Sequence, residues 1–176
     1  MHDKIQVKKA KGELLMFYNY SELLNNSDLF NFQHKRNFSN TERHLYNCAG
    51  YALGTFSWYC PNEEDNGYWD DGYWGDLDDT TMLMKTAETV QFMLKDFAGR
   101  LRLIGSVEEV RDNEYAIAYR LSRDGDFHFM KKTKNGWHHK RGWTDRIYVE
   151  SEDYVLKEVW CDRYDGPIVL MAMRRE

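Results

Sequence analysis

The sequence predicts an α+β fold, with helices in the first part of the chain and an antiparallel sheet in the second. Over residues 80–98 the apolar residues recur with helical spacing, whereas after Gly99 they alternate with a period of two. At 176 residues and 42% hydrophobic content, the chain is long enough for one core and short for two. We therefore expect helices packed on a sheet in a single domain of residues 1–176.

Two helices are expected before the sheet. The first begins at Cys48, after Asn47, and ends at about Gly54. The second spans residues 80–98, with Asp79 or Thr80 as N-cap and Gly99 as terminator. Its apolar stripe, which we expect to pack on the core, consists of Leu83, Ala87, Val90, Leu94 and Phe97.

Loops and strands account for most of the remaining chain. The first forty residues combine apolar pairs with Asn-rich turns, so we expect loops with one or two short helices there. Residues 61–79 are rich in Gly, Asp and Asn, which predicts a long surface loop. Period-two alternation predicts strands at 101–103, 115–121, 126–130, 137–140, 147–149, 154–156 and 168–171.

The charge balance and the cysteine content exclude several classes of protein. The formal net charge is −5, from 24 basic and 29 acidic residues, so neither nucleic acid nor an anionic membrane is an expected partner. No apolar run approaches the roughly 18 residues that cross a bilayer, and the N-terminus does not resemble a signal peptide. Three cysteines without paired spacing argue against a disulfide framework. We expect a cytoplasmic protein with reduced thiols.

Cys48 is the candidate nucleophile. A thiol at a helix start feels the positive end of the helix dipole, which is expected to lower its pKa. A thiolate also needs an imidazole to take and return a proton. His128 is the candidate, because alternation places it with Asp126 and Met130 on the face of its strand opposite two phenylalanines. We expect this face to look toward the helix that carries Cys48. Cys60 and Cys161 have no imidazole at a matching spacing and are predicted to be structural.

His139 is the candidate for the third member of the site, and its position depends on the hairpin register. If residues 131–136 form the whole loop, His128 lies opposite His139. A tight Asn135-Gly136 turn instead pairs His139 with Lys132 and separates the two imidazoles. His138 points to the other face and is expected to be exposed.

The motifs around these residues resemble a known superfamily. N-C-A-G-Y-A at a helix start, followed by D-F-H-F-M and W-H-H-K-R-G, is similar to the papain-like cysteine peptidases, specifically the NlpC/P60 type with its D-C-S-G-F box. The motifs also resemble uncharacterised bacterial and phage proteins with N-C-x-x-Y-A, D-[FY]-H-[FW] and W-x-H-K-x-G. The similarity covers roughly residues 44–142, and Asn47 replaces the aspartate of the box. It implies a papain-like fold with Cys48 as nucleophile, His128 as general base and acid, and His139 as the orienting residue.

The expected function is a thiol-dependent hydrolase, a cysteine peptidase or amidase acting on a peptide or peptidoglycan-like amide. The Cys48 amide with Asn47, Tyr46 or His44 is the expected oxyanion hole. Three aromatic residues of the acidic loop, Trp69, Tyr73 and Trp74, are candidates for binding substrate. We expect no cofactor and no metal, although Cys48, His128 and His139 are also zinc-ligand types. The same residues would also serve acyl transfer in place of hydrolysis, since both reactions begin with a thioester.

The alternative is a non-catalytic phage or bacterial accessory protein. It would keep the fold and bind its partner through the acidic aromatic loop, residues 62–79. The sequence leaves the substrate and the oligomeric state open.

Overall fold

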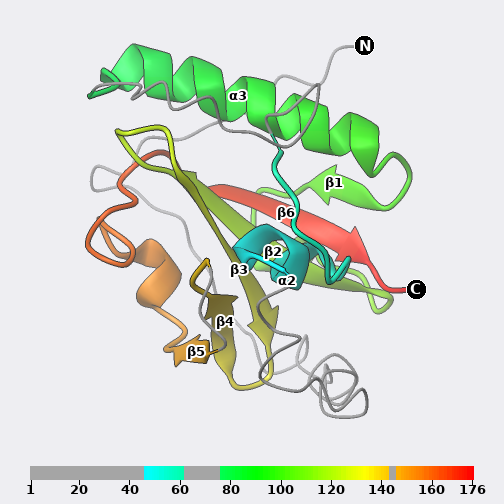
Figure 1. Cartoon of the computed structure of the whole chain (residues 1–176). Helices are drawn as coiled ribbons and strands as arrows, with labels where there is room; N and C mark the ends of the chain where they lie inside the picture. Colours follow the sequence, from blue (N-terminus) through cyan, green and yellow to red (C-terminus); the bar gives the residue numbers. More distant parts are fainter. Residues whose placement is uncertain (1–45, 62–75, 143–145) are drawn as a thin grey trace.

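One antiparallel sheet organises the part of the chain that the structure describes. The computed structural model describes residues 46–61, 76–142 and 146–176 (Figure 1). The strand order is β1-β6-β2-β3-β4-β5, and all the paired strands are antiparallel. The strands are β1 (Leu101–Leu103), β2 (Glu114–Leu121), β3 (Phe127–Thr133), β4 (Gly136–Lys140), β5 (Ile147–Glu150) and β6 (Val169–Arg174). Together with the two helices, this sheet confirms the α+β class.

The short helix α2 (Cys48–Leu53) forms where the sequence predicts it. The Asn47 side chain caps its start by accepting a hydrogen bond from the Gly50 amide, at 2.9 Å. Gly54 ends it in the left-handed conformation, with φ 73°, a conformation that glycine adopts without a steric penalty. These two caps fix Cys48 at the first position of the helix.

The long helix α3 (Asp79–Asp96) differs from the prediction in its N-cap and in its buried face. Asp78 is the N-cap, because its carboxylate accepts a hydrogen bond from the Thr81 amide at 2.7 Å. Leu83, expected in the core, is 42% exposed. Val90 is fully buried as predicted, and Leu94 and Phe97 are partly buried against the core. The other buried positions lie one residue before the predicted ones and include two threonines, which a search for apolar spacing does not detect; they are Met82, Thr86, Thr89 and Met93.

The two faces of the sheet are covered in different ways. On the helical face, α2 and α3 pack against large side chains of the strands, among them Tyr119, Phe127 and Phe129. On the loop face, residues 104–110 and 151–168 cover small and aromatic side chains, including Ala118 and Trp137. Strand β2 is buried along its whole length, as expected for a central strand covered on both faces.

Arg120 is one of the residues that hold the loop-face segment on the sheet. Arg120, fully buried on β2, donates hydrogen bonds to the backbone carbonyls of Gly166, Lys157 and Glu158 at 2.7 to 2.8 Å. Its guanidinium carbon lies 5.2 Å from the centre of the Trp160 ring. Burial lowers the Arg120 pKa to about 10, so the side chain stays charged at neutral pH.

One of the predicted strands is a helix turn. Residues 154–156 form the 3₁₀ helix η3 (Tyr154–Leu156), not a strand. The amides of Tyr154 and Leu156 donate to the carbonyls three residues earlier, at Ser151 and Asp153. Three alternating residues are too few to distinguish a strand from such a turn.

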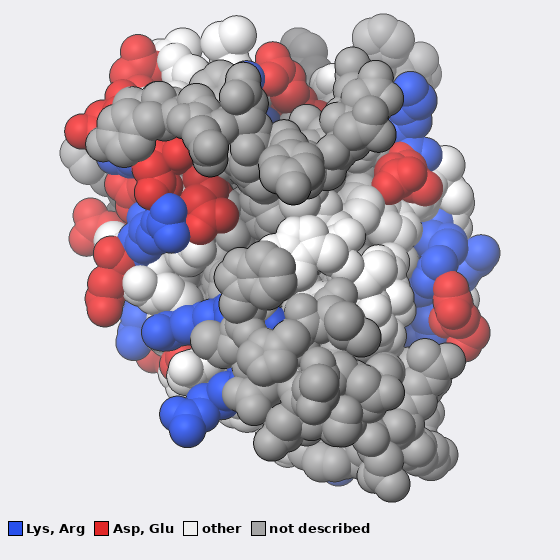
Figure 2. All heavy atoms as spheres, in the orientation of Figure 1, with Lys and Arg blue, Asp and Glu red and all other residues white. Residues whose placement is uncertain are grey.

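Charges of both signs are mixed on the surface. Figure 2 shows Asp and Glu among Lys and Arg, over the end of the molecule where α3 begins. Arg123 there bridges Asp79 and Asp165, at 3.0 and 2.9 Å. Among the described residues, none of the helices combines the length and the apolar character needed to cross a membrane.

Candidate active site

The β3–β4 hairpin sets the relation between the two histidines. Thr133 pairs with Gly136 and Lys131 with His138, so Lys134 and Asn135 form a two-residue turn. Both predicted registers were therefore wrong, and the true one lies between them. It sets His139 diagonal to His128 on the same face of the sheet, a separation that long or aromatic side chains can span.

His128 and His139 are in direct contact on the loop face. The expectation that His128 looks toward the helix that carries Cys48 was therefore wrong, because Cys48 packs with Phe127 and Phe129 on the opposite face of the sheet. Nε2 of His128 lies 2.8 Å from Nδ1 of His139, and the two rings are nearly perpendicular, at 88°. Both side chains are almost fully buried. Three tyrosine rings stack on the pair: Tyr164 on His128, and Tyr148 and Tyr154 on His139. The two imidazoles are thus in contact, as one of the two predicted registers implied, although the register itself is different.

Glu150 on β5 extends the pair. Its Oε1 lies 3.3 Å from Nε2 of His139, so the two ring nitrogens of His139 contact Glu150 on one side and His128 on the other. Sequence reasoning missed Glu150. Alternation along residues 147–150 places it on the same face as Tyr148, and only the β4–β5 register brings that face to His139.

These contacts assign the protons on both rings. An ionised carboxylate only accepts hydrogen bonds, so Nε2 of His139 carries a hydrogen and donates it to Glu150. Nδ1 of the neutral His139 ring is then an acceptor, and Nε2 of His128 is the donor between the rings. Nδ1 of His128 is left with a lone pair. Among the described residues it has no protein hydrogen-bond partner.

Burial keeps both imidazoles neutral. Desolvation is the main cause of the lowered pKa of His128, and the charges of His139 and Arg141 add to it. Desolvation also lowers the pKa of His139, although the Glu150 carboxylate opposes this shift. The resting site therefore holds two uncharged rings at neutral pH.

Cys48 lies against the strand that carries His128. Its Sγ is 3.9 Å from the carbonyl oxygen of Phe127. A hydrogen bond from the Phe129 backbone amide lowers the pKa of the thiol, although burial has the larger effect. Carbonyl and amide groups of a strand lie in the plane of the sheet, so the sulfur lies at an edge of β3, level with His128. Within the described residues, no hydrogen bond joins the Cys48 thiol to either imidazole.

The electrostatic expectation for Cys48 was wrong. The side chain is only 4% exposed, and desolvation raises the pKa of its thiol to about 12, whereas the helix start was expected to lower it. Burial therefore outweighs the dipole of a helix of only six residues. Cys48 is a neutral thiol at rest.

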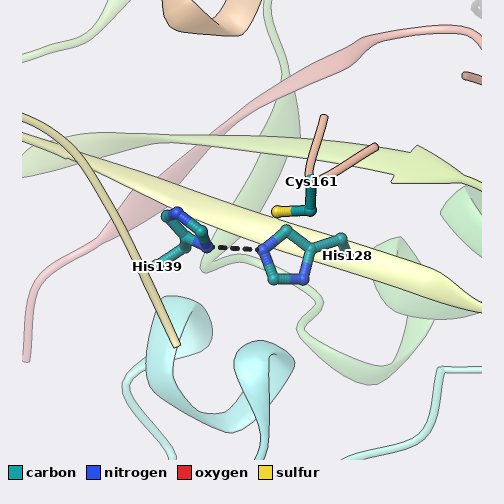
Figure 3. Close-up of side chains that lie close together, drawn as sticks. All are labelled: His128, His139 and Cys161. Carbon is teal, nitrogen blue, oxygen red and sulfur yellow. Dashed lines mark hydrogen bonds between the residues drawn. The ribbon is translucent and has the colours of Figure 1, made fainter. Parts of the chain in front are cut away.

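Cys161 is the thiol that the structure brings next to the histidines. Its Sγ and one nitrogen of each imidazole all lie within 4.8 Å of one another, and Figure 3 shows the sulfur projecting toward the two rings. Sequence spacing did not indicate this proximity, because the chain segments that meet here are distant in sequence, and the structural role of Cys161 stays a prediction.

A strained turn presents Cys161. Cys161 and Asp162 both have positive φ, 53° and 58°, which is uncommon for residues other than glycine. The Arg163 amide closes this turn by donating to the Trp160 carbonyl at 3.0 Å. The Cys161 amide donates to the Tyr154 hydroxyl at 3.0 Å, and this contact fixes the residue over the site. Burial raises the pKa of the Cys161 thiol, and Arg141 opposes the shift.

The residues predicted for the oxyanion hole have structural contacts. Nδ2 of Asn47 donates to the Tyr59 carbonyl at 2.7 Å, while its Oδ1 caps α2. The buried Tyr46 ring packs edge-on against Phe56. Their oxyanion role stays a prediction. Four other candidate residues lie outside the described residues: His44, Trp69, Tyr73 and Trp74.

Buried bases on the helical face were not expected. His138, predicted to be exposed, is buried, and desolvation with the charges of Lys131 and Lys132 lowers its pKa to about 4. Lys131 is also buried, with its ammonium 3.9 Å from the centre of the Tyr51 ring and 3.3 Å from the Tyr51 carbonyl oxygen. These contacts hold α2 against β3.

Comparison of the chain with models of protein families, with curated proteins and with solved structures finds no match. The likeness to papain-like peptidases therefore rests on the short motifs alone, and function has to be argued from the geometry of Cys48, His128, His139 and Glu150.

Proposed function

We propose that this protein is a thiol-dependent hydrolase that cleaves an amide bond in a papain-like manner. Cys48 is the nucleophile, His128 transfers the proton, and His139 positions His128. Glu150, at the end of the series, is a second positioning residue. The proposal also covers transfer of the acyl group to an acceptor other than water, because both reactions begin with the same thioester.

The single observation that carries this proposal is the series of hydrogen bonds from Glu150 through His139 to His128. A fixed carboxylate sets the tautomer of His139, and His139 in turn sets that of His128. The lone pair of His128 is thereby placed on Nδ1. The Cys48 sulfur touches the Phe127 carbonyl, one residue from His128, at the edge of the same strand.

In the proposed reaction the Cys48 thiol and the His128 imidazole are both neutral at the start. As Sγ of Cys48 bonds to the carbonyl carbon of the substrate, its proton passes to Nδ1 of His128. The imidazolium then gives this proton to the departing amine, and a thioester remains on Cys48. Water attacks the thioester with His128 as base, which releases the carboxylic acid and restores the thiol. Glu150 stabilises the positive charge that His128 and His139 share in between.

The test uses acyl donors that need no knowledge of the natural substrate. The full chain is incubated with p-nitrophenyl acetate, fluorogenic peptide amides and peptidoglycan fragments, and the acylated residue is mapped by mass spectrometry. We expect the acyl group on Cys48, and a loss of at least about 10³-fold in turnover for Cys48→Ala. Cys60→Ala is the matched control and should keep its activity. Acylation of Cys161 instead, or an unchanged rate in Cys48→Ala, would refute the proposal.

A second variant tests the series of hydrogen bonds. Glu150→Gln keeps the size of the side chain but removes the charge that fixes the tautomer of His139. We expect a roughly 10- to 100-fold lower kcat with a small change in KM, and a shifted pH profile. Glu152→Gln, on the same segment but paired with Lys132, is the control. A purely structural role of Glu150 would leave the pH profile unchanged.

A further inference from the structure

On the loop face, Cys161 joins the two histidines of the proposed reaction in a cluster of metal-ligand types, and the proposed reaction does not use Cys161. Cys161, His128 and His139 come from three different segments, and one ligand atom of each lies within 4.8 Å of the others. The three side chains converge, as Figure 3 shows. Thiolate and imidazole are the ligand types that zinc prefers.

We propose that Cys161, His128 and His139 bind a divalent zinc ion, and that this ion switches off the hydrolase. The inhibition, called the switching half below, rests on the proposed function, whereas the binding of zinc, called the binding half, does not. Three protein ligands leave the fourth tetrahedral position for water.

To bind the ion through the two nitrogens that now face each other, the rings have to separate and to turn so that both lone pairs point at it. Zinc bonds of 2.0–2.1 Å to nitrogen and 2.3 Å to sulfur separate tetrahedral ligands by about 3.3 to 3.6 Å. Nε2 of His128 and Nδ1 of His139 are 2.8 Å apart, so the rings have to open by about half an ångström. The Cys161 sulfur, at most 4.8 Å away, has to approach by about 1 Å. A half-buried residue in a turn can make that approach.

The surroundings suit a metal ligand set. Nε2 of His139 contacts the Glu150 carboxylate, and a carboxylate behind a ligating histidine orients the ring and raises its basicity. The positive charge and a hydrogen bond of the Arg141 guanidinium favour the thiolate form of Cys161. With one thiolate, one carboxylate and one guanidinium around it, a divalent ion leaves the site with a single net positive charge.

Zinc binding and catalysis require opposite tautomers of His128. The ion needs the lone pair of Nε2 of His128, which at rest carries the hydrogen that is donated to His139. On binding, the hydrogen of His128 moves to Nδ1, and the Cys161 proton is released to solvent. Nδ1 then has no lone pair to accept the Cys48 proton. Zinc therefore inhibits by changing the tautomer of His128, without touching Cys48.

The binding half is tested with Zn²⁺ and with Co²⁺, which reports thiolate ligation by its charge-transfer absorption. The full, reduced chain is titrated with each ion after treatment with chelator. We expect one equivalent to bind, with a cobalt–thiolate band that is lost in Cys161→Ala and kept in Cys48→Ala and Cys60→Ala. Circular dichroism checks that each variant is folded. A band that persists in Cys161→Ala, or no binding at all by the wild type, overturns the proposal.

The switching half is measured as the ratio of activities with and without one equivalent of Zn²⁺, within each variant. We expect at least a 10-fold inhibition in the wild type and less than a 2-fold change in Cys161→Ala. If the chain binds the ion through Cys161 but cleaves no amide, the proposed function fails and the metal site stands. If zinc inhibits Cys161→Ala equally, the ion acts elsewhere and the switch is wrong.

Discussion

The two faces of the sheet are built by different means. The helical face is covered by α2 and α3, whose caps and spacing are local features of the sequence. The loop face is covered by residues 151–168, which the buried Arg120 holds in place through three backbone carbonyls. The first face presents a buried thiol, whereas the second presents two imidazoles and another thiol.

The proposed reaction takes place at the boundary between the two faces. Cys48 belongs to the helical face, yet its sulfur touches β3 one residue from His128. Burial gives the thiol a pKa of about 12 and also lowers the pKa of His128, so neither group ionises alone. A reaction there has to transfer the proton as the new bond forms.

Removing the arginine that holds the loop face should have the largest effect on stability. Arg120→Leu removes the charged donor from three backbone carbonyls, of which Gly166 is in a buried hydrogen bond and Lys157 and Glu158 are in partly buried ones. An unsatisfied buried group costs about 1 to 3 kcal/mol. We expect a loss of about 3 to 5 kcal/mol in the free energy of unfolding, measured by urea denaturation. Arg100→Gln, which breaks only the exposed pair with Glu176, should cost less than about 1 kcal/mol. Equal effects of the two variants would show that the hydrogen bonds of Arg120 to the three carbonyls contribute little to stability.

Gly50→Ala tests the helical face by overpacking it. A Cβ at this position would lie 1.9 Å from the Ser57 carbonyl oxygen, so α2 or residue 57 has to shift. We expect a loss of about 1 to 3 kcal/mol in stability, read from the urea midpoint, and a slower acylation of Cys48. Gly99→Ala is the control, because its Cβ meets nothing within 4 Å and only its φ of 77° opposes the change. If Gly99→Ala costs more, close packing of α2 is not the reason for Gly50.

Acid should weaken both faces through their buried histidines. The folded-state pKa values of His128 and His138 lie below the unfolded value near 6.5, so the unfolded chain binds more protons below that pH. Stability is therefore full above about pH 6.5 and falls by about 1.4 kcal/mol per pH unit for each such histidine as the pH decreases. Urea midpoints between pH 7 and 5 measure this slope. His128→Gln and His138→Gln should each make it shallower, and a flat wild-type profile would contradict the buried neutral rings.

Sequence predicted the helical face better than the loop face, for physical reasons. Asn47 and Gly54 mark the ends of α2 because capping depends on neighbouring residues. In α3, Val90 was correctly predicted to be buried, but the other fully buried positions lie one residue before the predicted ones, since Thr86 and Thr89 bury a face that apolar counting does not detect. On the loop face, the 3₁₀ turn at residues 154–156 was taken for a strand.

In the candidate site, the sequence predicted the two histidines but not Glu150 and Cys161, which lie beside them. Alternation placed His128 and His139 on one face even though both proposed registers were wrong, because a shift by an even number of residues preserves the face. Glu150 lies beside the two histidines because of the β4–β5 register. Cys161 lies there because Arg120 holds residues 157–166 on the sheet. Neither of these long-range arrangements leaves a pattern in the sequence near the residues that it positions.

Relative reactivity of the cysteines gives the smallest effect and the most direct comparison of the two faces. Cys48 is almost fully buried with a thiol pKa of about 12, whereas Cys161 is half-buried and lies next to the Arg141 guanidinium. Because only the thiolate reacts, limiting iodoacetamide at pH 7 should label Cys161 about 10-fold faster than Cys48, as read by peptide mapping. In urea the two rates should converge, since the difference comes from folding alone. If Cys48 reacts first in the folded chain, its thiol is ionised and open to solvent at rest, and the proton transfer to His128 precedes substrate binding.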